Sequence, residues 1–134
     1  MYVLYREVSA YDDGNQLLGI FECIESAKQS KAKYIKENTD IDPFKNQSYR
    51  NVDLEADVKI ETIPFDGIKS NYDEAFLVVA LEEGFGQINR KFVCAYESEA
   101  NAKDYSRQIE EELEWENSWC EVERIEIGQL VSNA

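Results

Sequence analysis

Hydrophobic and polar residues in the first half of the chain form two strand-like runs, followed by a predicted helix and a third strand. Residues 2 to 8 and 16 to 22 are rich in β-branched, aromatic and leucine side chains, which is typical of strands. Between them, residues 12 to 15 include a glycine and an asparagine, which supply the positive φ angles of a tight hairpin. A helix is predicted from residue 24, and the partial alternation of residues 58 to 63 predicts a third strand. The first half therefore predicts the order β-β-α-β.

The second half predicts the same order of elements. Strands are expected at residues 75 to 82 and 90 to 96, with a glycine-rich turn at residues 84 to 86 between them. A helix follows, for which Ser98 is a suitable N-cap. Alternating apolar residues at 122 to 127 predict a last strand, which stops at a glycine.

The two halves align as copies of one unit, offset by 75 residues. Apolar and polar classes agree along the aligned stretch without a gap. The matched segments are Tyr2 to Tyr5 with Leu77 to Ala80, Phe21 and Glu22 with Tyr96 and Glu97, and Ala27 and Lys28 with Ala102 and Lys103. The alternative is accidental agreement between two similar β-β-α segments.

The predicted fold is α+β, with two pseudo-symmetric β-β-α-β copies at residues 1–66 and 67–134. They are expected to form antiparallel sheets with helices packed on one side, in a single compact domain. A copy of about 60 residues would bury too little surface to be stable alone. Residues 39 to 53 are an insertion in the first copy, and the polar residues 66 to 73 link the copies.

The chain is strongly acidic, because it contains 28 Asp and Glu but only 14 Lys and Arg, and it has no histidine. A net charge of −14 on 134 residues repels nucleic acid and anionic membranes, and it attracts basic surfaces. The chain is nevertheless expected to fold, since 43% of its residues are hydrophobic and 12% are aromatic.

Three further features predict a soluble cytoplasmic protein. No apolar run approaches the roughly 20 residues that span a bilayer. The N-terminus lacks the basic and apolar regions of a secretory signal. Cys23, Cys94 and Cys120 lack the spacing of a disulfide framework or a CxxC motif, so we expect three reduced thiols. Cys23 and Cys94, on predicted strands or strand ends, are interpreted as small core residues.

The helix of the second half carries an unusual acid run. Its apolar stripe consists of Ala102, Tyr105, Ile109 and Leu113. Five glutamates occupy the seven residues from 110 to 116, where they repel one another and oppose the helix dipole. This charge is either kept for a partner or simply forms a solvated face that aids solubility.

We interpret the acid run as the candidate partner-binding face, with a tryptophan as its anchor. The candidate residues are Glu110, Glu111, Glu112, Glu114, Trp115 and Glu116. Secondary candidates in predicted loops are Asp12, Asp13, Asp40 and Asp42. Trp119 is interpreted as covering a sheet edge.

Most catalytic chemistries lack their residues in this chain. Without histidine there is no Ser-His or Cys-His pair, and the glycines at residues 84 and 86 do not form a phosphate-binding loop. The aspartates lack the spacing of a calcium loop. Catalysis by a pair of carboxylates, one acting as acid and the other as base, is an alternative that the sequence leaves open. We expect no enzyme activity, no cofactor and no metal site, and no direct nucleic-acid binding, because the lysines at residues 28 to 36 lie on a mixed face.

The sequence therefore favours a non-enzymatic acidic protein that neutralises a basic protein partner. The main hypothesis is an immunity protein or antitoxin that inhibits a bacterial toxin such as a nuclease, whose phosphate-binding site must be basic. One alternative is a nucleic-acid-mimic inhibitor of the phage anti-restriction or anti-CRISPR type, because the acid run approaches the charge density of duplex DNA. Another is a generic protein-interaction module. The protein is expected to be a monomer or a homodimer.

Overall fold

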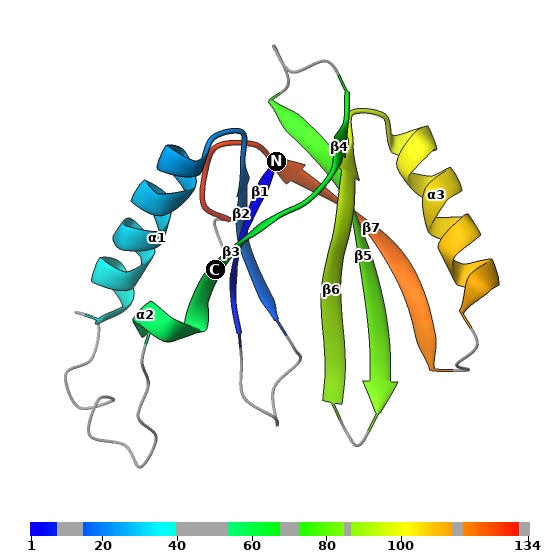
Figure 1. The fold of residues 1–134 in the computed structure, drawn as a ribbon, viewed down its shortest axis with the longest axis horizontal. Coiled ribbons are helices and arrows are strands. Elements are labelled where there is room, and N and C mark those ends of the chain that lie inside the picture. The colour runs from blue at the N-terminus through cyan, green and yellow to red at the C-terminus, as the bar shows by residue number, and fades with distance from the viewer. Residues whose placement is uncertain (8–14, 40–53, 68–72, 85–86, 114–116, 132–134) are drawn as a thin grey trace.

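The computed structural model describes residues 1–7, 15–39, 54–67, 73–84, 87–113 and 117–131 (Figure 1). The first half forms a three-stranded antiparallel sheet, in the order β2-β1-β3. These elements are β1 (Tyr2–Arg6), β2 (Gln16–Phe21), the long helix α1 (Ile24–Thr39), the short helix α2 (Leu54–Asp57) and β3 (Val58–Thr62). The predicted insertion, residues 39 to 53, lies outside the described residues except for its first position.

The second half, together with β4 from the end of the first half, forms a four-stranded sheet in the order β4-β6-β5-β7. Its elements are β4 (Phe65–Asp66), β5 (Glu74–Gly84), β6 (Gln87–Tyr96), α3 (Glu99–Glu112) and β7 (Ser118–Glu126). β4 runs parallel to β6, whereas the other pairs are antiparallel. Ser98 caps α3 as predicted, because its hydroxyl accepts from the Asn101 N–H at 3.3 Å.

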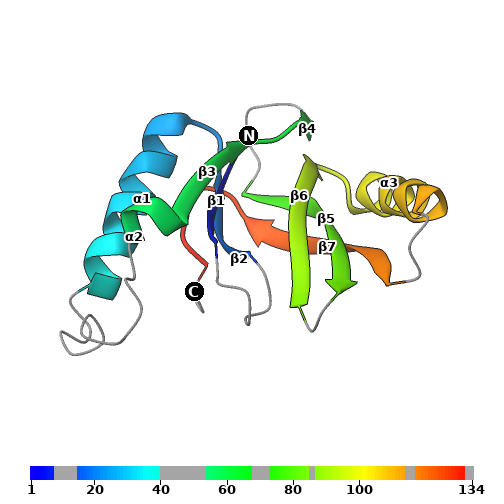
Figure 2. The same cartoon turned by 60° about the horizontal axis from the view of Figure 1, so that its bottom comes forward.

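The two sheets pack against each other, and each helix covers the outer face of one sheet (Figures 1 and 2). The central core between the sheets includes Val3, Leu77 and Phe92. A second core joins α1 to its sheet, and a third joins α3 to its sheet. Both faces of β1 and β5 are therefore covered, which explains why their hydrophobic runs do not alternate with polar residues.

Each half also contributes a segment to the sheet of the other half. After β3 the chain crosses to the second sheet, where the Pro64 carbonyl accepts from the Ala95 N–H at 3.0 Å and β4 pairs with β6. After β7 the chain crosses back to β2, where the Gly128 N–H donates to the Ile20 carbonyl at 2.8 Å. Gly128 has a φ of 89°, which favours glycine at this turn.

Strand pairing corrects the predicted alignment of the copies at the first strand. Tyr2 lies opposite Phe21, and the residue opposite Tyr96 is Phe76 rather than the predicted Leu77. The correspondence is thus displaced by one residue along the first strand, because the second hairpin is one residue longer than the first. Both hairpins contain a register shift at the equivalent place in the strand pair. Superposition of the two halves remains a prediction.

The α+β class and the single compact body are confirmed. Each sheet has its long helix on one side, as predicted, but the two helices lie on opposite sides of the molecule (Figure 1). The reason is that the inner faces of the sheets bury each other. Among the described helices, none is long and apolar enough to cross a membrane.

Candidate functional site

The C-terminal turn of α3 is the described part of the predicted partner-binding face. The helix ends at Glu112, and its C-cap Leu113 donates its N–H to the Glu110 carbonyl at 3.3 Å. Glu110, Glu111 and Glu112 are all exposed, and the last turn contains no basic residue. The carboxylates therefore stand at the negative end of the helix dipole without compensation from that turn.

Tertiary structure brings two further glutamates to this end of the second sheet. Glu82 and Glu83 are exposed at the end of β5, which pairs with the start of β7. The Glu83 N–H donates to the Asn117 carbonyl at 2.9 Å, next to the segment that returns from α3. We call Glu82, Glu83, Glu110, Glu111 and Glu112 the acidic end. Glu82 and Glu83 were not among the predicted site residues. The signal that could have found them is their place at the end of a strand in an expected antiparallel sheet.

Glu110 differs from its neighbours because it also stabilises the fold. Its Oε1 accepts from the Cys120 N–H at 2.9 Å, so the carboxylate ties the end of α3 to β7. Glu110 is therefore neither a purely solvated charge nor one kept only for a partner, because it also has a role in the fold. Among the described residues, Glu111 and Glu112 take part in no comparable hydrogen bond.

Basic residues elsewhere in the described structure pair with other carboxylates. These ion pairs are Lys31 with Glu55, Lys59 with Glu7, Lys103 with Glu99, Arg107 with Asp104, and Arg124 with Glu74. Within the described part of the chain, no ion pair reaches the acidic end. Its charge is thus available to a basic partner.

Several predicted site residues lie outside the described residues. They are Glu114, Trp115, Glu116, Asp12, Asp13, Asp40 and Asp42. Trp119 is described: it is half-buried against the central core, and its indole N–H donates to Glu121 Oε1 at 3.1 Å. This aromatic ring therefore lies near the start of β7, opposite Leu81 of β5 and next to the position of Glu82.

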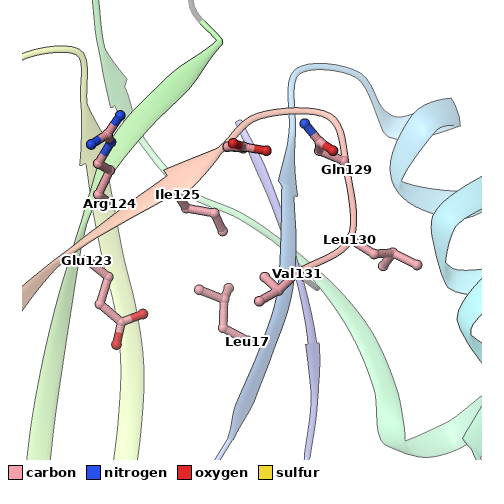
Figure 3. Close-up of a pocket in the computed structure, with 8 residues that line it drawn as sticks. Leu17, Glu123, Arg124, Ile125, Gln129, Leu130 and Val131 are labelled. Carbon is pink, nitrogen blue, oxygen red and sulfur yellow. The ribbon is translucent and has the colours of Figure 1, made fainter. Parts of the chain in front are cut away.

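A pocket of about 290 Å³ lies where the chain leaves β7 and crosses to β2 (Figure 3). Leu17, Ile125 and Val131 form its apolar wall, and Glu123 adds a carboxylate. In Figure 3 these side chains point toward one space, whereas Arg124 points away from it. The sequence shows no sign of this pocket, because Leu17 and Val131 meet only through the crossover after β7.

Glu123 has the most unusual environment among the described carboxylates. It is half-buried, and burial raises its pKa, with Arg90 opposing the shift and Glu121 adding to it. Arg90 comes from β6, and its Nε is buried without a hydrogen-bond partner among the described residues. One half-buried carboxyl beside an arginine can hold a cationic or polar group, but it is not by itself an acid–base pair.

The three cysteines are free thiols. Cys94 and Cys120 are buried, and burial raises the pKa of both, so they behave as core residues. The prediction of a core position is wrong for Cys23, which is exposed. It occupies the cap position of α1, where the Ser26 N–H donates to its Sγ at 3.4 Å. In the described part of the chain, no three His, Cys, Asp or Glu side chains converge as metal ligands would.

Comparison with known proteins gives no family for this chain. No protein-family model matches it, and the searches of curated proteins and of solved structures found no match.

Proposed function

We propose that this chain is a non-enzymatic acidic binding protein that neutralises a basic protein partner. The biological role that follows most directly is an immunity protein or antitoxin that inhibits a bacterial toxin such as a nuclease. A nuclease must present lysines and arginines to phosphate, and an inhibitor gains association rate and affinity by covering them with carboxylates.

The observation that carries this proposal is the acidic end. Residues from β5 and α3, far apart in the chain, supply five exposed carboxylates at one end of the second sheet. Acids at a helix C-terminus work against helix stability, so their retention is better explained by binding than by folding, except at Glu110. The net charge of −14 extends the attraction beyond the contact surface.

The arrangement favours a compact acidic patch over a nucleic-acid mimic. A mimic needs two rows of acids along an extended face, to match the phosphates of a duplex. The described members of the acidic end occupy instead one helix turn and the adjoining end of β5, where the successive residues Glu82 and Glu83 point to opposite faces of the sheet.

Charge reversal at the acidic end tests the proposal. The double variant Glu111→Lys/Glu112→Lys leaves the Glu110 hydrogen bond in place, and Glu37→Lys/Glu61→Lys on the first half makes the same change in net charge at exposed sites. Immobilised native protein should capture a basic protein from its source organism at low salt, and should inhibit the toxic activity of that protein. The first variant should lose association rate and salt dependence, while the control should bind almost as the native protein does.

Two results would contradict the proposal. One is a captured partner without a basic surface or without inhibited activity. The other is equal loss of binding in both double variants, which would show that net charge alone matters and that the acidic end is a solvated face.

A further inference from the structure

β7 is an edge strand whose backbone groups alternate in direction. The Ile127 N–H donates to the Asp73 carbonyl at 2.8 Å, and the Asn117 carbonyl accepts from Glu83, so odd-numbered residues face β5. The Cys120 N–H points the other way, to Glu110. The even-numbered residues of β7 therefore direct their N–H and C=O groups to the outer edge.

Both ends of this edge are occupied, whereas its middle is unpaired within the part of the chain that the structure describes. Glu110 caps it at Cys120, and β2 pairs with it at Gly128 through Ile20. Between these points, Val122 and Arg124 present outward backbone groups to which no described residue makes a backbone hydrogen bond. An unpaired stretch of this kind is a template for an added strand.

The surface beside the free edge selects for basic and apolar side chains. Glu121, Glu123 and Ile125 alternate along one face of β7, next to the pocket formed with Leu17 and Val131. On the other face, Arg124 is already paired with Glu74 at 2.5 Å. An added strand would thus meet carboxylates and an apolar hollow on one face only.

These charges also argue against a second copy of the chain as the occupant. Antiparallel pairing of two β7 edges would place Glu123 near its own counterpart, beside the other acids of the strand. A partner segment with lysine or arginine at alternate positions would meet complementary charge instead.

We propose that the free edge of β7 at Val122 to Arg124, with the adjoining pocket, binds an extended basic segment of a partner protein by antiparallel strand addition. The added strand places cationic side chains beside Glu121 and Glu123, and an apolar side chain against Ile125 in the pocket. Its alternate N–H groups donate to the β7 backbone. This surface adjoins the acidic end at Cys120, where Glu110 caps the edge, but it is a different part of β7, and the inference does not depend on the toxin role.

A synthetic peptide tests strand addition directly on the native protein. The probe is acetyl-Thr-Leu-Thr-Lys-Thr-Lys-Thr-amide, in which leucine and the lysines would face Ile125, Glu123 and Glu121. Methylation of the backbone nitrogens at peptide positions 3 and 5, the threonines opposite Arg124 and Val122, removes the two N–H groups aimed at the free stretch of β7. Methylation at the two lysines removes two N–H groups that point away. All three peptides carry the same charge.

Calorimetric titration should show saturable binding of the unmodified and the lysine-methylated peptide. The threonine-methylated peptide should bind about tenfold or more weakly, because two backbone hydrogen bonds are lost. Equal binding of both methylated peptides would reveal charge attraction alone and overturn the proposal, as would no saturable binding of the unmodified peptide.

A protein variant supplies the second measurement. Glu123→Gln should weaken the unmodified peptide about threefold to tenfold, whereas Glu61→Gln, an exposed acid on the edge strand β3, should leave it unchanged. Equal weakening of peptide binding by both variants would contradict the placement of the binding site at Glu123. The Glu111→Lys/Glu112→Lys variant should keep binding the peptide with the same dependence on methylation. The two proposals can therefore fail separately. Failed partner capture with intact peptide binding would contradict only the proposed function, and failed peptide binding with intact partner capture would contradict only strand addition at β7.

Discussion

Glu110 and Glu111 are adjacent on α3, but only Glu110 accepts a hydrogen bond from β7. Glu110→Ala should lower the free energy of unfolding by about 0.5–1 kcal/mol, the usual worth of a partly exposed hydrogen bond. Glu110→Gln keeps an acceptor oxygen and should lose less. Glu111→Ala should be neutral or slightly stabilising, since it removes an acid from a helix C-terminus. Urea unfolding of the three variants measures this order, and equal stability of Glu110→Ala and Glu111→Ala would contradict the role of Glu110.

Glu123 makes stability depend on pH in a direction set by its burial. Burial raises its pKa in the folded protein; Arg90 opposes this shift and Glu121 adds to it. The folded state therefore holds the carboxyl proton of Glu123 more tightly than the unfolded chain does. The contribution of Glu123 to the free energy of unfolding is therefore fully present below the ordinary glutamate pKa. It is lost as the pH rises through the raised pKa of the folded protein. Glu123→Gln should match the native protein in acid and exceed it at neutral pH by less than about 1 kcal/mol, because solvent screens a half-exposed group. Unfolding curves from about pH 4 to about pH 8 measure this difference, and a difference that does not vary with pH would contradict it.

At the scale of elements, the crossover after β7 depends on a close approach to β2. A Cβ on Gly19 would lie 2.9 Å from the Phe21 ring and 3.0 Å from the Gln129 carbonyl oxygen, which belongs to the crossing segment. Gly19→Ala should therefore displace this segment and destabilise the protein by about 1–3 kcal/mol.

Gly84 is the matched control for Gly19, because it also lies in a strand but a Cβ there would meet no atom within 4 Å. Gly84→Ala should be neutral or slightly stabilising, since alanine restricts the unfolded chain. Thermal unfolding compares the two variants, and equal stability would show that the crossover does not need the close approach at β2.

At the scale of the whole molecule, neither half encloses the central core. Val3 and Ile20 from the first sheet pack with Leu77 and Phe92 from the second, and each half lends a segment to the other sheet. Fragments 1–66 and 67–134 should each be largely unfolded or aggregated alone, because the inner face of each sheet would be exposed. Mixed together, they should regain native circular dichroism as a one-to-one complex. Cooperative unfolding of either fragment alone as a monomer would contradict this prediction.

Local pattern was sufficient for most elements and for some individual residues. The order β-β-α-β in each half, the Ser98 cap and the burial of Cys94 follow from periodicity, capping chemistry and side-chain type, which act over a few residues. The strand β4 is too short for a pattern to reveal, and its parallel pairing with β6 is a long-range contact. Cys23 has the same side chain as Cys94, but it sits at the exposed start of α1, so residue type alone assigned it wrongly.

The α+β class, the positions of the two long helices and the acidic character of the last turn of α3 can be derived from the amino-acid sequence, because each depends on local periodicity or on formal charge. Three features are visible only in the folded protein: the helices lie on opposite sides, Glu82 and Glu83 join the acidic end, and Glu110 accepts a hydrogen bond from β7. The same holds for the pocket at Glu123 and the free edge of β7. The physical reason is that these features depend on which sheet faces bury each other and where the chain crosses between sheets, and such contacts join residues far apart in the chain.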